Sequence, residues 1–313
     1  MLNKLRYWLI GPPLQTQEMG ENRLNKIRAL AAFSPDALSS IAYANQEIYL
    51  GLVVAGSAGL LLSWPVGIAI TVLLSIVALS YFQTIHGYPS GGGSYVVARE
   101  NLGTLAGLIA ASALLIDYLL TAAVSLTAGV EAIASAFPAL WPYRELVALA
   151  FLGVIMLLNL RGLRETGTMM AIPVYLFLLA YLPMLVYGVV RLVIDGPVTL
   201  DETALPITHP LTAYLILRAF ATGCTALTGI EAISNGVPVF RSPESKNAGR
   251  TLIVMAILMG TLFVGSIGLT QYLGIVARPD ETILSALARR RGTSLARAAC
   301  TWMSIWIQTR RVV

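Results

Sequence analysis

The chain consists mostly of apolar stretches long enough to cross a lipid bilayer, and this feature limits its fold more than any other. A membrane-spanning helix needs roughly 20 predominantly apolar residues. Because the bilayer core offers no water to satisfy backbone N–H and C=O groups, such stretches favour helices. We therefore predict an all-α integral membrane protein with seven spans, at about 26–54, 60–85, 103–137, 144–160, 168–194, 211–239 and 250–276.

The composition supports a membrane protein and narrows its partners. Of the 313 residues, 57% are hydrophobic and 12% are charged, whereas soluble domains contain about 25% charged residues. The net charge of +5 therefore does not indicate a nucleic-acid partner, and we expect membrane lipids around the chain. Two widely separated cysteines indicate neither a disulfide framework nor a bound metal site, and we expect no cofactor.

The basic residues predict the orientation, because lysine and arginine collect in cytoplasmic loops. We place the N-terminal segment, residues 1–24, in the cytoplasm of a multi-pass protein of the cell membrane. The opposite loop at 195–210 then contains no lysine or arginine. The loops on the cytoplasmic side contain Lys4, Arg6, Arg23, Lys26, Arg28, Arg99, Arg161, Arg164, Arg241, Lys246 and Arg250.

Two predicted spans are interrupted by polar and small residues. The first contains FSPDALSSIAYANQEIY at 33–49, and the sixth contains ALTGIEAISNGV at 226–237. Interrupted spans at corresponding positions of two halves indicate a transporter binding site. We predict that helices 1 and 6 are broken. Because the two are five spans apart, we predict that 25–195 is a five-helix repeat and that 211–277 begins its inverted copy.

Acidic residues lie in the middle of three predicted spans, at Asp36, Asp117 and Glu231. Asp117, Thr121 and Ser125 recur every four residues and so share one helical face. A charge at a helix centre costs about 2.5–3.5 kcal/mol on insertion scales, so such residues face the protein interior and have partners there. No lysine or arginine lies at matching depth. Three acids without a basic partner indicate a mobile cation or protons.

Four segments resemble a known family: FSPDALSSIAYANQEI, GYPSGGGSYVVARENLG, LLIDYLLTAAVSLTAGVEA and ALTGIEAISNGVPVFRSPESKNAGRTL. They are similar to the KimA-type potassium importers of the KUP group, within the APC superfamily of secondary transporters. The resemblance covers about residues 25–287. It implies an inverted-repeat fold of the LeuT type and proton-coupled potassium uptake by alternating access.

The resemblance also implies the residues of the site. A hard cation prefers several oxygen ligands in place of its hydration shell. Because burial and neighbouring like charge both disfavour an ionised acid, we expect Glu231 and Asp36 to take part in proton coupling. The implied potassium ligands are Asp36, Tyr43, Asp117, Tyr118, Thr121, Ser125, Thr228 and Glu231.

The main alternative is a proton-coupled amino-acid permease of the same superfamily. Such proteins bind the substrate carboxylate with exposed amides at a glycine-rich break in the first helix. Here that stretch reads DALSSIAY, with Asp36 and no glycine, which favours a cation.

We expect no enzyme, because no nucleophile lies near a base at suitable spacing. A sensor or scaffold is another class, which ion-flux measurements would separate from a carrier. GYPSGGGSY lacks the ending of a phosphate-binding loop and indicates a turn.

The last segment departs from the family pattern. The family has about twelve spans and then a cytoplasmic domain, through which full-length relatives are expected to form homodimers. After about residue 288 the resemblance ends in RRRGTSLARAACTWMSIWIQTRRVV, which is rich in arginine and has no run long enough to span. Seven spans would leave it outside, where basic residues do not collect. We expect 278–313 to be an atypical tail, frameshifted or truncated. A non-functional fragment is therefore a further alternative.

Overall fold

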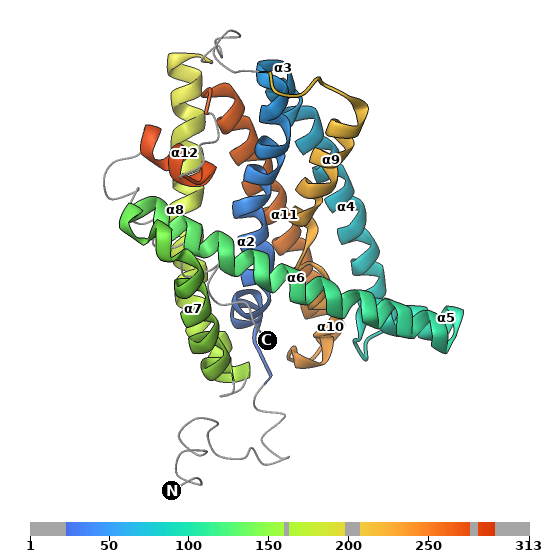
Figure 1. Cartoon of the computed structure of the whole chain (residues 1–313). Coiled ribbons are helices and arrows are strands. Elements are labelled where there is room, and N and C mark those ends of the chain that lie inside the picture. The colour runs from blue at the N-terminus through green and yellow to red at the C-terminus, as the bar shows by residue number, and fades with distance from the viewer. Residues whose placement is uncertain (1–22, 160–162, 198–206, 276–280, 292–313) are drawn as a thin grey trace, which may run out of the picture.

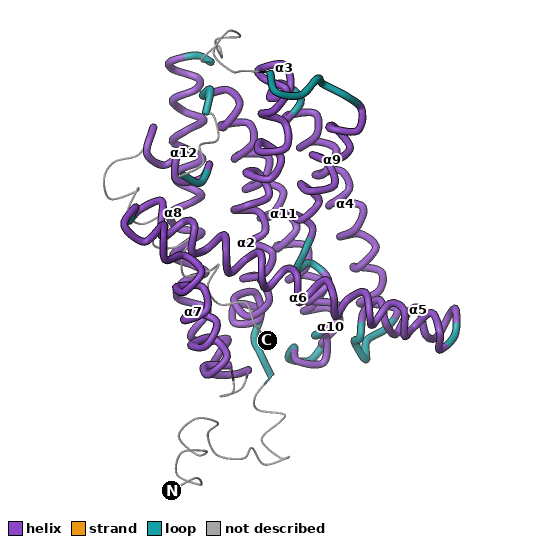
Figure 2. Tube along the Cα trace, viewed as in Figure 1, coloured by secondary structure: helices purple, strands orange, loops and turns teal. Residues whose placement is uncertain are grey.

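The structure, a computed structural model, describes residues 23–159, 163–197, 207–275 and 281–291. Within these ranges the chain is almost entirely helical, and Leu24 and Phe240 form an isolated bridge between extended segments. Figure 1 shows long helices running side by side, with α5 and α6 crossing them obliquely. Figure 2 shows that most connections are short.

The helices follow the predicted spans closely. Short 3-10 turns at Val53–Ala55, Pro138–Tyr143, Cys224–Leu227 and Val237–Val239 connect or extend them. The helices are α2 (Lys26–Leu52), α3 (Gly56–Leu61), α4 (Ser63–Gly87), α5 (Gly93–Leu102), α6 (Thr104–Ala136), α7 (Arg144–Asn159), α8 (Leu163–Asp195), α9 (Ala213–Gly223), α10 (Glu231–Asn235), α11 (Glu244–Tyr272) and α12 (Ile283–Arg291).

Five helical segments of the described chain are long and apolar enough to cross a membrane, which confirms an all-α membrane protein. The other two predicted spans coincide with α2 and with the segment from α9 to α10, and the count of seven spans stays a prediction. The five segments are Ser63–Gly87, Thr104–Ala136, Pro138–Leu157, Ala171–Asp195 and Glu244–Tyr272.

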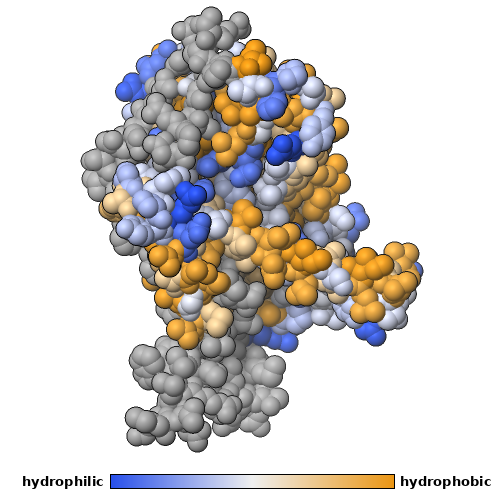
Figure 3. All heavy atoms as spheres, viewed as in Figure 1, coloured by the Kyte–Doolittle hydropathy of each residue, from blue (hydrophilic) through white to orange (hydrophobic). Residues whose placement is uncertain are grey.

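Helix α2 is the centre of the bundle. It packs against α8, α9 and α11, and α11 packs in turn against α4. Ala37, Ile41 and Ile48 of α2 are fully buried. The outer helices instead expose apolar side chains, as Figure 3 shows over α5 and α6, where Leu105 and Leu115 are exposed. Apolar residues on both inner and outer surfaces are expected where lipid, rather than water, surrounds the helices.

The predicted break in the first helix is wrong. α2 is continuous from Lys26 to Leu52 and contains Pro35, although proline removes one helical hydrogen bond. The hydroxyls of Ser39 and Ser40 each donate to the backbone carbonyl of Asp36 at 2.9 Å. The serines therefore satisfy their polar groups within the helix, and a polar composition does not require the backbone to unwind.

The predicted break in the sixth helix is confirmed. α9 ends at Gly223, a 3-10 turn follows, and Thr228 is extended with a ψ of 148°. Gly229 then has a φ of +88°, a conformation that glycine adopts at little cost. The chain re-enters a helix at Glu231, where the five-residue α10 begins.

The two predicted half-repeats begin with segments that run in opposite directions. In Figure 1, α2 runs upward and the segment from α9 to α10 runs downward. This arrangement is compatible with inverted repeats, but the LeuT-type fold stays a prediction. The division into 1–24, 25–195, 211–277 and 278–313 also stays a prediction, and residues 292–313 of the expected atypical tail lie outside the described residues.

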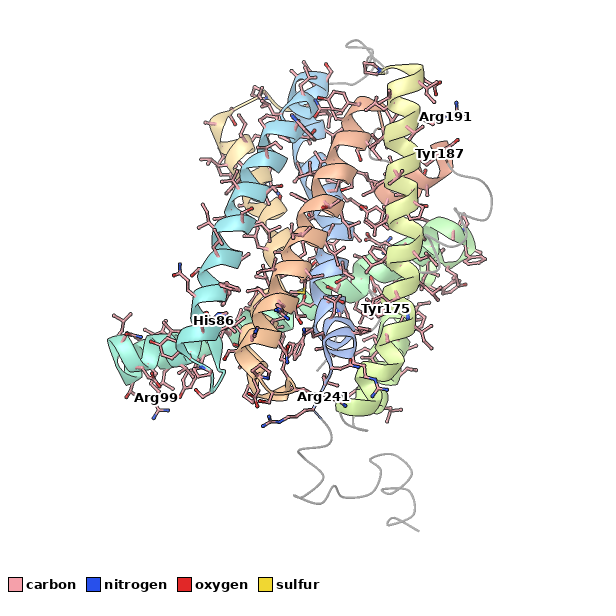
Figure 4. All side chains as sticks on the ribbon, turned by 180° about the vertical axis from the view of Figure 1, so that it is seen from behind. His86, Arg99, Tyr175, Tyr187, Arg191 and Arg241 are labelled. Carbon is pink, nitrogen blue, oxygen red and sulfur yellow. The ribbon has the colours of Figure 1, made fainter. Side chains whose placement is uncertain are left out.

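We call the end of the molecule where α2 begins the lower end, and the opposite end the upper end. At the lower end, Leu24 N donates to Val239 O at 2.9 Å, and Arg23 forms an ion pair with Glu244. Figure 4 shows Arg99 and Arg241 at this end, with Arg191 at the upper end. Basic residues gather at the lower end in accord with the predicted orientation, and the cytoplasmic location of the N-terminus stays a prediction.

Gly67 allows α4 and α11 to approach closely, because a Cβ atom there would lie 2.7 Å from Ile267 Cδ1. We expect Gly67→Leu to reduce the free energy of unfolding by about 1–3 kcal/mol through overpacking. Thermal unfolding in detergent measures the change. Gly87→Leu on the same helix is the control, since a Cβ there meets nothing within 4 Å. An equal loss in both variants would contradict the packing argument.

Candidate functional site

The break in the sixth segment meets α2 at Gly229 and Asp36. A Cβ atom at Gly229 would lie 2.5 Å from Ala37 N and 2.8 Å from Asp36 Cβ. Only a residue without a side chain allows this approach. The contact places the residues on both sides of the break, Thr228 and Glu231, next to the middle of α2.

Hydroxyl groups link the two segments. Ser40 Oγ is hydrogen-bonded to Thr228 Oγ1 and lies 3.3 Å from Tyr43 OH. Ser40 and Tyr43 are both buried. Two predicted site residues, Tyr43 and Thr228, are therefore joined through Ser40, to which the sequence analysis gave no role. Ser40 lies four residues after Asp36 and three before Tyr43, so all three share one helical face. This spacing is a signal in the sequence that could have identified Ser40.

The carboxylate of Glu231 is held at the break itself. Glu231 is 6% exposed, and its Oε1 accepts a hydrogen bond from Gly229 N at 3.2 Å. It also interacts electrostatically with the carboxylate of Asp117 on α6. Two carboxylates from distant parts of the chain therefore influence each other at the break.

The predicted polar face of the third span lies on α6, which is one continuous helix. Thr121 and Ser125 are buried along this face, and the Thr121 hydroxyl interacts with the Asp117 carboxylate. Beside them, Tyr118 OH accepts a hydrogen bond from Asn235 Nδ2 at 2.6 Å. This bond joins α6 to the end of α10.

The predicted residues thus fall into two groups. The first group, Asp36, Tyr43, Thr228 and Glu231, lies where α2 meets the break. The second group, Asp117, Tyr118, Thr121 and Ser125, lies along α6. Two interactions link the groups: the electrostatic interaction between the Glu231 and Asp117 carboxylates, and the hydrogen bond from Asn235 to Tyr118.

Two further residues were missed by the sequence analysis. Tyr81 of α4 interacts electrostatically with Glu231 and Asp117, and its hydroxyl lies 3.1 Å from Ser94 Oγ. Asn235 holds Tyr118, as described above. Asn235 lies four residues after Glu231 and so one helical turn away, which is a signal in the sequence. Tyr81 carries no such signal, because only packing brings α4 to the site.

A second polar cluster lines a cavity of about 230 Å³ between α2, α6 and the segment before α12. The carboxylates of Glu47 and Glu131 repel each other, and Arg144 attracts that of Glu131. Tyr43 lines the cavity and also contacts Ser40, so its side chain lies between the cavity and the site. The polar lining consists of Tyr43, Gln46, Glu47, Thr127, Glu131 and Thr282.

Comparison with known proteins decides the family. A model described as amino acid permease matches residues 27–307. The chain belongs to the amino acid permease family. As a member of this transporter family with several membrane-capable helices, it is a multi-pass membrane protein rather than an enzyme. The resemblance to the APC superfamily is confirmed.

The chain is also similar to a curated relative, potassium transporter KimA of Bacillus subtilis (strain 168). The two are 45% identical over 291 residues, which is 92% of this permease-family chain and 48% of KimA. The chain therefore spans about half the length of this relative. The resemblance to KimA-type proteins, which the four sequence motifs carried, is confirmed.

Gly229 should be the least replaceable position of the site. We expect Gly229→Ala to lower the free energy of unfolding by about 1–3 kcal/mol, because alanine at positive φ is strained and its methyl group would press on α2. Thermal unfolding in detergent measures the loss. Gly260→Ala on α11, where the nearest atom to a Cβ is 3.9 Å away, should be neutral. A Gly229→Ala protein as stable as Gly260→Ala would refute the close contact.

Proposed function

We propose that the chain contains the cation site of a proton-coupled potassium transporter of the cell membrane that works by alternating access. The observation that carries the proposal is the set of carboxylates from α2, α6 and α10. Among the described residues, the charged group that acts on Glu231 is another acid, Asp117. No lysine or arginine of the described chain acts on the carboxylate of Glu231 or on that of Asp117. The similarity to a protein named as a potassium transporter supports the choice of cation.

The ligands that we propose offer oxygen atoms of different charge. Carboxylates attract the ion, and phenol and hydroxyl oxygens replace part of its hydration shell. The contacts of Ser40 with Thr228 and Tyr43 keep two of these oxygens close together. The proposed set is Asp36, Tyr43, Asp117, Tyr118, Thr121, Ser125, Thr228 and Glu231.

We further propose that Glu231, together with Asp36, couples protons to potassium. Two carboxylates that share a low-dielectric site repel each other unless a cation or a proton lies with them. Glu231 and Asp117 are such a pair. A potassium ion and a proton bound together neutralise the two negative charges of the pair, so each favours the binding of the other, which is a physical basis for moving both in the same direction.

The continuity of α2 bears on the alternative of an amino-acid substrate. An amino-acid carboxylate needs free backbone amides, which a break in the first helix would supply. In a continuous helix only the amides of the first turn are free of helical hydrogen bonds, and Asp36 lies beyond that turn of α2. A cation is therefore the better match to this part of the site.

We propose that the cavity at Glu47 and Glu131 is a vestibule that supplies cations to the site. Two acids in a cavity walled by low-dielectric protein raise the local concentration of cations. Tyr43 connects this cavity to Ser40, so the proposed path leads past its phenol. The attraction between Arg144 and Glu131 moderates the negative charge.

Proteoliposomes with an internal pH-sensitive dye test the coupling. We expect external potassium to stimulate proton uptake, and Glu231→Gln to abolish the stimulation because the amide cannot take up a proton. Glu145→Gln, at an exposed residue of α7, should behave like the unmodified chain. Unchanged coupling in Glu231→Gln would disprove the proton role.

Adding amino acids in place of potassium tests the substrate in the same vesicles. Proton uptake driven by amino acids would favour the permease alternative. If neither potassium nor amino acids stimulate proton uptake, this chain alone does not transport.

The vestibule is tested by its dependence on ionic strength. We expect Glu47→Gln combined with Glu131→Gln to reduce the initial rate of potassium uptake severalfold at low salt. Choline chloride at about 0.5 M should remove the difference, because it screens charges beyond a few ångströms. Glu100→Gln, at an exposed residue of α5, is the control. A deficit that persists unchanged at high salt would contradict an electrostatic role.

A further inference from the structure

Asn235, the last residue of α10, contacts two other elements of the lower half of the molecule. Its side-chain Nδ2 donates to Tyr118 OH of α6 at 2.6 Å. Its backbone carbonyl accepts a hydrogen bond from Gly92 N at 3.4 Å. Gly92 belongs to the loop between α4 and α5, within the GYPSGGGSY motif. One residue thus joins the break, the polar helix α6 and this loop.

The glycines at the end of this loop and at the start of α5 are required by this contact. Gly91 and Gly93 are buried and have φ values of +78° and +48°. A Cβ atom at Gly91 would lie 2.8 Å from Pro238 Cδ and 2.9 Å from Asn235 O. A Cβ atom at Gly93 would overlap Asn235 Oδ1. The loop is therefore a backbone surface that docks on the end of α10, and its glycines do more than form a turn.

The hydrogen bond from Asn235 fixes the direction of the Tyr118 hydroxyl. An amide nitrogen can only donate, so Tyr118 oxygen is the acceptor in this bond. The phenol proton and the remaining lone pair must then point elsewhere. The carboxylates that act on this phenol are Glu231 and Asp117. The phenol oxygen that Asn235 contacts is therefore also the one on which these two acids act.

We propose that Asn235 is a positioning residue, which orients Tyr118 toward the carboxylates and is itself held in place by the docked glycines at 91–93. The proposal rests on the proposed function in one respect, that the cation is potassium. Loss of the Asn235 amide frees the Tyr118 phenol to rotate and weakens cation binding. A side chain at Gly93, the first residue of α5, displaces the Asn235 amide and has the same effect on Tyr118.

Potassium-dependent thermal stabilisation of the whole chain in detergent micelles tests the proposal. A ligand at free concentration L that binds the folded state raises its stability by RT ln(1 + L/Kd), so the dependence on ligand concentration gives the dissociation constant. We expect Asn235→Ala to raise the dissociation constant for potassium about tenfold, the effect of one lost hydrogen bond near charge. Choline chloride corrects for ionic strength. Gly93→Ala should reproduce the change. Gly103→Ala should not, because it also places alanine at a positive φ of +94° but has no atom within 4 Å of a Cβ.

A double-mutant cycle separates positioning from a general loss of structure. If Asn235 acts through Tyr118, then Asn235→Ala has no further effect on potassium affinity in a Tyr118→Phe background. Two independent, additive losses would overturn the proposal. An unchanged affinity in Asn235→Ala would overturn it as well.

Hydrogen–deuterium exchange gives a readout that does not depend on the ligand. We expect Gly93→Ala, whose Cβ would overlap Asn235 Oδ1, to increase exchange severalfold in residues 88–96 and to leave α11 unchanged. Faster exchange in a chain that shows no response to potassium would contradict the proposed cation and leave the positioning role standing. A potassium response with unchanged exchange in residues 88–96 would contradict the docked loop.

Discussion

The close approach of Gly229 to α2 is the contact on which the rest of the site depends. A break in a membrane helix exposes backbone groups that lipid cannot satisfy, so it must be covered by protein. Here the cover is the middle of α2, and the missing Cβ of Gly229 allows the two backbones to meet. That single contact places Thr228 against Ser40, and it brings the Gly229 amide that holds the Glu231 carboxylate up to Asp36. A larger residue at position 229 would push the broken segment away from α2 and so separate all of these groups at once.

Much of the fold could be predicted because hydrophobic length directly determines spanning helices. The third span, predicted at 103–137, is α6 at Thr104–Ala136. The break in the sixth helix was predictable since Gly229 favours a local loss of helix. The first helix shows the limit of such reasoning. Its polar residues suggested a break, yet the serine hydroxyls bond within the helix and α2 stays continuous. Composition reveals polarity, whereas the backbone conformation depends on where each hydrogen bond is made.

The site, like the fold, contains some features that the local sequence predicts and others that it does not. The shared face of Asp117, Thr121 and Ser125 follows from helical spacing alone, and the structure shows one uninterrupted helix there. The bond between Asn235 and Tyr118 and the bond between Ser40 and Thr228 join residues far apart in sequence. Local patterns cannot indicate these bonds, because they arise when separate helices pack together. The ligand roles of the eight proposed residues came from a family resemblance and remain a proposal that the contacts support.

Under the proposed function, the distribution of charge along α2 has a consequence for how an ion would move. Asp36 and Glu47 are separated by eleven residues, which is roughly 16 Å along a helix and about half the thickness of the hydrocarbon core. Between them, Tyr43 contacts both the cavity and Ser40. A third carboxylate at that position would bind a cation tightly and hold it there. A phenol offers oxygen without charge, and passage requires binding weak enough for the ion to leave. The alternation of acid, phenol and acid therefore suits a path on which the ion is attracted at each end and is not trapped between them.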